Sequence, residues 1–318
     1  MSARGPWGSF LAIAVICGFY LAAPFPSRAQ AWLPPKGEGS FSFAYQTGIT
    51  RDHADFGGKR VDDGRNKWHG MVQYVEYGLT DKIALDLSIP FYSGVYNGPT
   101  PHPNNNTDDG TYHGAFQDFR FNVRYNIRRN PLMITPFVGT ALPSHNYEFH
   151  AHSAVGKRMR EVAFGANLGR ALDPLLPRAY FQEQISYVVS ERVEGYRPNR
   201  TQVMGEFGVF VTRRLSLQFL HTLRITHSGC DFVYAGAGPS KDDCEATLVT
   251  SVNHDRIHRS NFLNLAGGFS LALSKSWSLF SSVGKTVWTH NSHALNPSFT
   301  FGFTRSFRTG PERARHDH

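Results

Sequence analysis

Hydrophobic and polar residues alternate along most of this chain with a period of two, which is typical of β-strands whose two faces meet different surroundings. The clearest run is 116–128. Its apolar face consists of Phe119, Phe121, Val123, Tyr125 and Ile127. Its polar face consists of Asp118, Arg120, Asn122, Arg124, Asn126 and Arg128. Such a strand would lie between an apolar and a polar environment.

The same alternation predicts about twelve strands. They cover roughly 38–50, 67–79, 83–92, 116–128, 132–142, 160–170, 178–190, 201–211, 215–226, 261–273, 277–288 and 297–307. The pattern also admits ten or fourteen strands, because the first and seventh runs are the least regular. Most runs are about ten residues long, which is the length that a tilted strand needs to cross a bilayer.

The connections between these strands alternate between short and long. Turns of about three residues occur at 80–82, 129–131, 212–214 and 274–276, whereas long polar loops are expected at 51–66, 93–115, 143–158 and 227–258. Tight turns at one rim and long loops at the other are typical of a transmembrane β-barrel in a bacterial outer membrane. We therefore predict an all-β antiparallel barrel, with both termini on the periplasmic side because the strand number is even.

The N-terminus is predicted to be a cleaved signal peptide over residues 1–31. Arg4 precedes an apolar run that ends near Pro24 and Pro26, and Ala29-Gln30-Ala31 is a suitable cleavage site. The apolar run is too short for a spanning helix. The barrel would then occupy 32–307 and a polar periplasmic tail 308–318.

Composition changes this interpretation little. The mean hydropathy of −0.35 resembles that of a soluble protein, but every second residue of a barrel strand faces a polar lumen. The net charge of +8 falls to about +6 without Arg4 and Arg28, which suits contact with lipopolysaccharide phosphates and outer-membrane lipids. Scattered charges argue against nucleic acid as a partner. The aromatic run 297–307 ends in Phe307 and resembles the strand that the barrel-assembly machinery recognises.

Two cysteines would remain after processing, Cys230 and Cys244, both in the loop 227–258. A disulfide between them is expected in an oxidising periplasm. Two free thiols are the alternative.

The polar faces of the strands predict a lumen lining that would set the selectivity of a pore. The pore-lining candidates are Asp86, Asp118, Arg120, Asn122, Arg124, Glu161, Glu206, Gln218 and Arg224. The alternative is that these groups only pair with one another and with water in a closed lumen. The barrel would then be a structural or surface-interaction protein. The predicted function is passive or facilitated diffusion of an unidentified small molecule through the lumen, with loops 93–115 and 227–258 as gates.

The hairpin Tyr77-Gly78-Leu79-Thr80-Asp81 and the strand that follows it to Pro90-Phe91 resemble the "MetA-pathway of phenol degradation" family of outer-membrane proteins. Thr135-Pro136-Phe137 is similar to the same family. The resemblance implies a barrel that transports small hydrophobic or aromatic molecules, and it supplies no ligand residues.

An enzyme is the second hypothesis. His258-Arg259-Ser260-Asn261 resembles the His-x-Ser-Asn core of the outer-membrane phospholipase A family, which implies His258 as base and Ser260 as nucleophile. Phe262 stands where that family has glycine. We therefore expect a protein that is not an enzyme.

No metal and no cofactor are expected. The pairs His150/His152, His254/His258 and His290/His293 could clamp a transition metal, but no further ligand follows at a fixed spacing. Solvated loop histidines are the simpler interpretation. Trp68, Trp277 and Trp288 are expected at the membrane interfaces.

Overall fold

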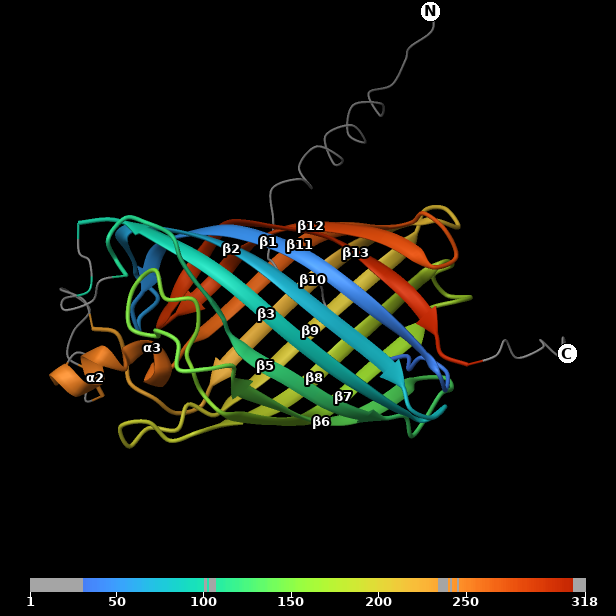
Figure 1. Ribbon diagram of the computed structural model, residues 1–318, viewed down its shortest axis with the longest axis horizontal. Helices are drawn as coiled ribbons and strands as arrows, with labels where there is room; N and C mark the ends of the chain where they lie inside the picture. Colours follow the sequence, from blue (N-terminus) through green and yellow to red (C-terminus); the bar gives the residue numbers. More distant parts are fainter. Residues whose placement is uncertain are drawn as a thin grey trace, which may run out of the picture.

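The computed structural model describes residues 31–99, 102, 107–233, 240, 242–244 and 246–310. It is a closed antiparallel barrel, drawn lying on its side in Figure 1. Its strands are β1 (Glu38–Ala54), β2 (Arg60–Gly78), β3 (Ile83–Asn97), β4 (His113–Phe116), β5 (Asp118–Tyr125), β6 (Met133–Pro143), β7 (Glu161–Ala171), β8 (Ala179–Ser190), β9 (Arg200–Phe210), β10 (Leu215–Thr226), β11 (Asn261–Ala272), β12 (Trp277–His290) and β13 (Ser292–Arg308).

The prediction of twelve strands is confirmed. Strands β4 and β5 both pair with β3 and are separated only at Gln117, so they form one interrupted strand of the wall. Neighbours in sequence are neighbours in the sheet, and β1 pairs with β13 to join the two ends of the barrel. Closure removes the unpaired sheet edges that cannot exist in a bilayer.

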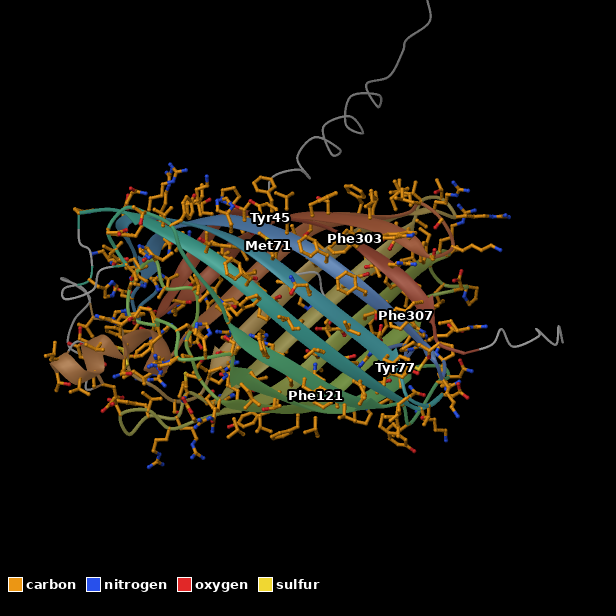
Figure 2. The ribbon with its side chains drawn as sticks, viewed as in Figure 1. Tyr45, Met71, Tyr77, Phe121, Phe303 and Phe307 are labelled. Carbon is orange, nitrogen blue, oxygen red and sulfur yellow. A yellow bond between two sulfur atoms is a disulfide. The ribbon has the colours of Figure 1, made fainter. Side chains whose placement is uncertain are left out.

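The wall is apolar outside and polar inside. In β5, Phe119, Phe121 and Val123 are exposed on the outer face, whereas Arg124 is buried at 1% exposure. The labelled side chains of Figure 2, including Tyr45, Met71 and Phe303, lie on the same outer surface. This outer band is what a barrel presents to lipid.

The short connections gather at one end, as predicted, at 79–82, 126–132, 172–178, 211–214 and 273–276. We call this the short-turn end. The opposite end carries the connections 98–112, 144–160, 191–199 and 227–260, and we call it the cap end. Two short helices, α2 (Leu248–Val252) and α3 (His254–Ile257), lie at the cap end in Figure 1. No described helix is long and apolar enough to cross a membrane.

The prediction of a long loop at 51–66 is wrong. Strands β1 and β2 continue through most of it and leave only the connection 55–59, and β12 and β13 are likewise joined at Asn291 alone. These strands are polar on both faces where they project beyond the apolar band, so their alternation is lost although their pairing continues.

The expected signal peptide lies outside the described residues except for Ala31, and so does the tail from 311 onwards. The interface assignment of Trp68 is wrong, because its ring lines the internal cavity. Trp277 and Trp288 are partly exposed on the outer surface, where a girdle residue would lie.

Candidate functional site

The barrel encloses a cavity of about 450 Å³. Its wall combines aromatic and charged side chains, and the cap-end connection 144–160 closes part of it. The aromatic and aliphatic lining includes Trp68, Val72, Tyr74, Tyr92, Phe137, Val188, Met204 and Leu295. The charged lining consists of Asp86, Arg120, Arg124, Glu161 and Arg200. A cavity of this size, with few charged groups among apolar ones, is of the kind that holds small organic molecules.

Arg124 forms the most buried charged group of the lumen. Its guanidinium donates to Asp86 Oδ1 from Nε at 3.2 Å and from a terminal nitrogen at 2.8 Å, and it also donates to Glu76. The three side chains are between 2% and 13% exposed. Because one cation serves two carboxylates in a nearly dry setting, we infer that Arg124 fixes this part of the wall and is not a mobile binding group.

A second cavity of about 160 Å³ adjoins the first toward the cap end, and the two share Gln117, Arg120, Glu161 and Arg200. Its lining includes the cations Lys157, Arg120, Arg200, Arg224 and Arg256. Its acids are Asp118 and Glu161, so the formal charge is +5 − 2 = +3. Arg200 forms an ion pair with Glu161, and the Arg224 guanidinium lies 4.9 Å over the Phe262 ring. We call this region the basic constriction.

All nine pore-lining candidates point to the interior. Asp86, Arg120, Asn122, Arg124 and Glu161 line the main cavity, and Asp118 and Arg224 line the basic constriction. Glu206 and Gln218 lie instead beside Tyr180, where the Gln218 amide donates to Glu206 at 3.0 Å.

The pore-lining set missed Glu76 and Arg200. Arg200 immediately precedes the predicted strand 201–211, so extending that strand by one residue would have placed it on the face of Gln202. Glu76 had no such signal, because β2 carries polar residues on both faces.

The segment before β1 folds back into the barrel at the short-turn end. Ala31 is fully buried; its amide donates to Gln182 Oε1 at 3.2 Å and its carbonyl accepts from Thr135 Oγ1 at 2.7 Å. Trp32 packs edge-on against Tyr180. Gly169 also makes room for Trp32, since a Cβ there would lie 3.1 Å from the Trp32 ring. We call Trp32–Gly37, which would remain after cleavage at Ala31, the inner segment.

The cap end has a small apolar core of its own. It contains Met159, Val193, Phe232 and Ile257, together with the disulfide between Cys230 and Cys244. The disulfide closes part of the connection 227–260, which therefore forms a packed cap rather than an extended loop.

Seven histidines gather beside this core, namely His53, His102, His150, His152, His254, His258 and His293. The expectation of solvated loop histidines is wrong for His254 and His258, which are at most 6% exposed. Burial and the neighbouring His102 and His254 lower the pKa of His150. Burial favours a higher pKa for Asp108, but hydrogen bonds from His102, Ser153 and His152 outweigh it and hold that pKa below its usual range.

His258 and Ser260 do not form the predicted base–nucleophile pair. The His258 Nδ1–H donates to the His254 carbonyl at 2.9 Å, and Ser260 Oγ lies 2.8 Å from Ser292 Oγ. Both residues line the basic constriction and are at most 4% exposed. Both residues precede β11, which begins at Asn261, so no strand places their side chains on one face. Their position inside the barrel offers no access to bilayer lipid.

No protein-family model and no curated protein sequence matches this chain. Among solved structures, an outer membrane channel from Pseudomonas putida F1 is similar over 90% of this chain and 100% of that chain, with a TM-score of 0.66 and 14% identity. The chain has the fold of an outer-membrane β-barrel. The NanC porin is similar over 83% of this chain and 98% of that chain, with a TM-score of 0.49 and 10% identity. At these identities the comparison establishes the fold and not the solute.

Proposed function

We propose that this protein is an outer-membrane channel through which small organic molecules pass by passive or facilitated diffusion. The observation that carries the proposal is the internal cavity of about 450 Å³, which continues into the basic constriction inside a wall with an apolar outer face. A lumen filled by its own side chains would instead support the closed, structural barrel. Among the described hydrogen bonds, the side chains of His258 and Ser260 bond to the His254 carbonyl and to Ser292 and not to each other, which removes the support for a phospholipase.

The lining favours a solute that has both an apolar body and a negative charge. Trp68, Tyr92 and Phe137 can contact an aromatic or aliphatic group, while Arg120 and Arg200 attract an anion. A small aromatic carboxylate satisfies both requirements. The Tyr77–Asp81 hairpin also supports membership in the "MetA-pathway of phenol degradation" family, which we include in this proposal.

The gates include a connection that the sequence did not suggest. Besides 98–112 and 227–260, the connection 144–160 enters the barrel, and Ser153 and Val155 line the main cavity. At the other end, the inner segment occupies part of the lumen through Trp32, which packs against Tyr180. We therefore infer a narrow route with an obstruction at each end rather than an open pore.

Single-channel conductance of the refolded protein in a planar bilayer tests this proposal. Discrete steps are expected, with a preference for anions that weakens in Arg120→Glu. Arg213→Glu is the matched control, because Arg213 is exposed in the turn 211–214, and its selectivity should equal that of the wild type. Arg124 is unsuitable for this test since it is held by two carboxylates.

Vesicle-swelling rates test the class of solute. Benzoate should enter faster than neutral benzyl alcohol in wild-type vesicles, and the difference should shrink in Arg120→Glu. A correctly folded barrel that passes neither ions nor these solutes would contradict the channel proposal.

A further inference from the structure

Three side chains of the cap-end histidine cluster have the chemistry and the spacing of metal ligands. His102 and Asp108 come from the connection 98–112, and His152 comes from 144–160. One ligand-capable atom of each residue lies within 4.8 Å of those of the other two. His152 is 44 positions from Asp108 in the sequence, so the fold and not a local motif brings the two connections together.

One of the three ligand separations is close to that of a tetrahedral zinc site. Zinc binds imidazole nitrogen and carboxylate oxygen at about 2.0–2.2 Å, so neighbouring ligand atoms of a tetrahedral site are about 3.3 Å apart. His102 Nδ1 lies 3.1 Å from Asp108 Oδ2, which matches that separation. The ligand-capable atom of His152 lies within 4.8 Å of both and supplies the third ligand.

The backbone around the site fixes Asp108. Its Oδ2 accepts from the amides of His102 at 3.0 Å and His152 at 3.1 Å, and its Oδ1 accepts from the Ser153 amide at 2.9 Å. The side chain of Asp108 is fully buried and that of His102 is 9% exposed. The ring of Tyr96 stacks on that of His152 at 4.2 Å, which holds the imidazole in place. A site with ligands held in this way needs little rearrangement to bind an ion.

We propose that His102, His152 and Asp108 bind a divalent transition-metal ion of the Zn²⁺ class at the cap end of the barrel. Two imidazoles and one carboxylate favour such ions over Ca²⁺ and Mg²⁺, which prefer oxygen ligands alone. Water completes the coordination, or one of two neighbouring imidazoles does. His150 and His254 lie with ring centres 4.7 Å and 5.2 Å from that of His102.

Binding of the ion would replace the hydrogen bond between His102 and Asp108 by one metal–ligand bond to each of these residues. The Nδ1–H of His102 now donates to Asp108. Coordination through Nδ1 requires the neutral ring to carry its proton on Nε2 instead, so the proton moves within the imidazole and none has to leave the protein. The ion would join the connections 98–112 and 144–160, and the second of these lines the cavity.

The test is isothermal titration of the refolded, EDTA-treated barrel with ZnCl₂. We expect one ion for each barrel. The variant His102→Ala/His152→Ala should bind at least about 100-fold more weakly. The matched control is His145→Ala/His227→Ala, two exposed histidines outside the cluster, and it should bind like the wild type.

A second measurement needs no variant. Co²⁺ added to the wild type should give the visible absorption of a four- or five-coordinate site, and one equivalent of Zn²⁺ should abolish it. Binding that is unchanged in the His102→Ala/His152→Ala variant would overturn the proposal. So would a wild type that binds no Zn²⁺ more tightly than it binds Ca²⁺. Both results are independent of whether the barrel conducts.

Discussion

Replacing Arg124 by methionine tests whether the lumen excludes water around its charged groups. Methionine keeps most of the volume but leaves the carboxylates of Asp86 and Glu76 without their cation. Removing one partner of a buried ion pair costs about 3–5 kcal/mol, because the remaining charge is uncompensated. We expect the free energy of unfolding to fall by about 4 kcal/mol at pH 7.

Proton uptake provides an independent estimate of this loss in the free energy of unfolding. The folded variant can relieve the repulsion by protonating one carboxyl group. At pH 7 this costs about 4 kcal/mol for a carboxyl of ordinary pKa near 4, and at pH 5 about 1.4 kcal/mol. The folded variant then binds more protons than the unfolded chain, so lowering the pH stabilises it. The loss should therefore shrink to below about 2 kcal/mol at pH 5.

The assay is chemical unfolding of the refolded barrel in lipid vesicles, followed by tryptophan fluorescence at pH 7 and pH 5. Arg213→Met is the control, because Arg213 is exposed at the short-turn end and should cost less than about 0.5 kcal/mol. A loss below about 1 kcal/mol, or one that is equal at both pH values, would refute the reasoning. It would mean that lumen water solvates the two carboxylates.

Three further changes probe other parts of the molecule. Gly169→Val should displace the inner segment and raise single-channel conductance, whereas Gly267→Val, at a position with no atom within 4 Å of the added Cβ, should leave conductance unchanged. Phe121→Arg should cost about 2–4 kcal/mol in unfolding experiments, the range for a charge placed near the middle of the bilayer on the outer face of a barrel. Replacing Cys230 and Cys244 by serine removes a cross-link worth about 3 kcal/mol. The connection 227–260 should then be cleaved faster in limited proteolysis while the circular dichroism spectrum of the barrel stays the same.

Alternation along single strands predicted the inward and outward faces of the barrel wall. It succeeded because every membrane-crossing residue faces either lipid, which favours apolar side chains, or the polar lumen. In β5 it separated Phe121 from Arg124 correctly. The rule fails where strands leave the bilayer, since both faces then meet water or other polar groups. The projecting part of β1, which includes Asp52 and His53, therefore resembled a loop although it pairs with β13 beyond two irregularities in the register.

The sequence predicted which face of the wall each site residue lies on, but not which residues it contacts. Alternation shows that Arg124 faces inward, but only the register of β2, β3 and β5 shows that it meets both Glu76 and Asp86. The histidine cluster was beyond prediction for the same reason. His102 and His152 lie in different irregular connections, whose packing depends on a cap core formed by distant residues.

The inner segment also acts as a ligand tethered to its own receptor. A group held by a short flexible linker has an effective concentration in the millimolar range at its binding site. Trp32 packs against Tyr180 inside the barrel and is joined to β1 by the few residues up to Gly37. A solute that uses this end of the lumen competes with that concentration. Such a solute either binds the wall well or is present at millimolar levels, so transport should reach half-saturation at a lower solute concentration in Gly169→Val than in the wild type.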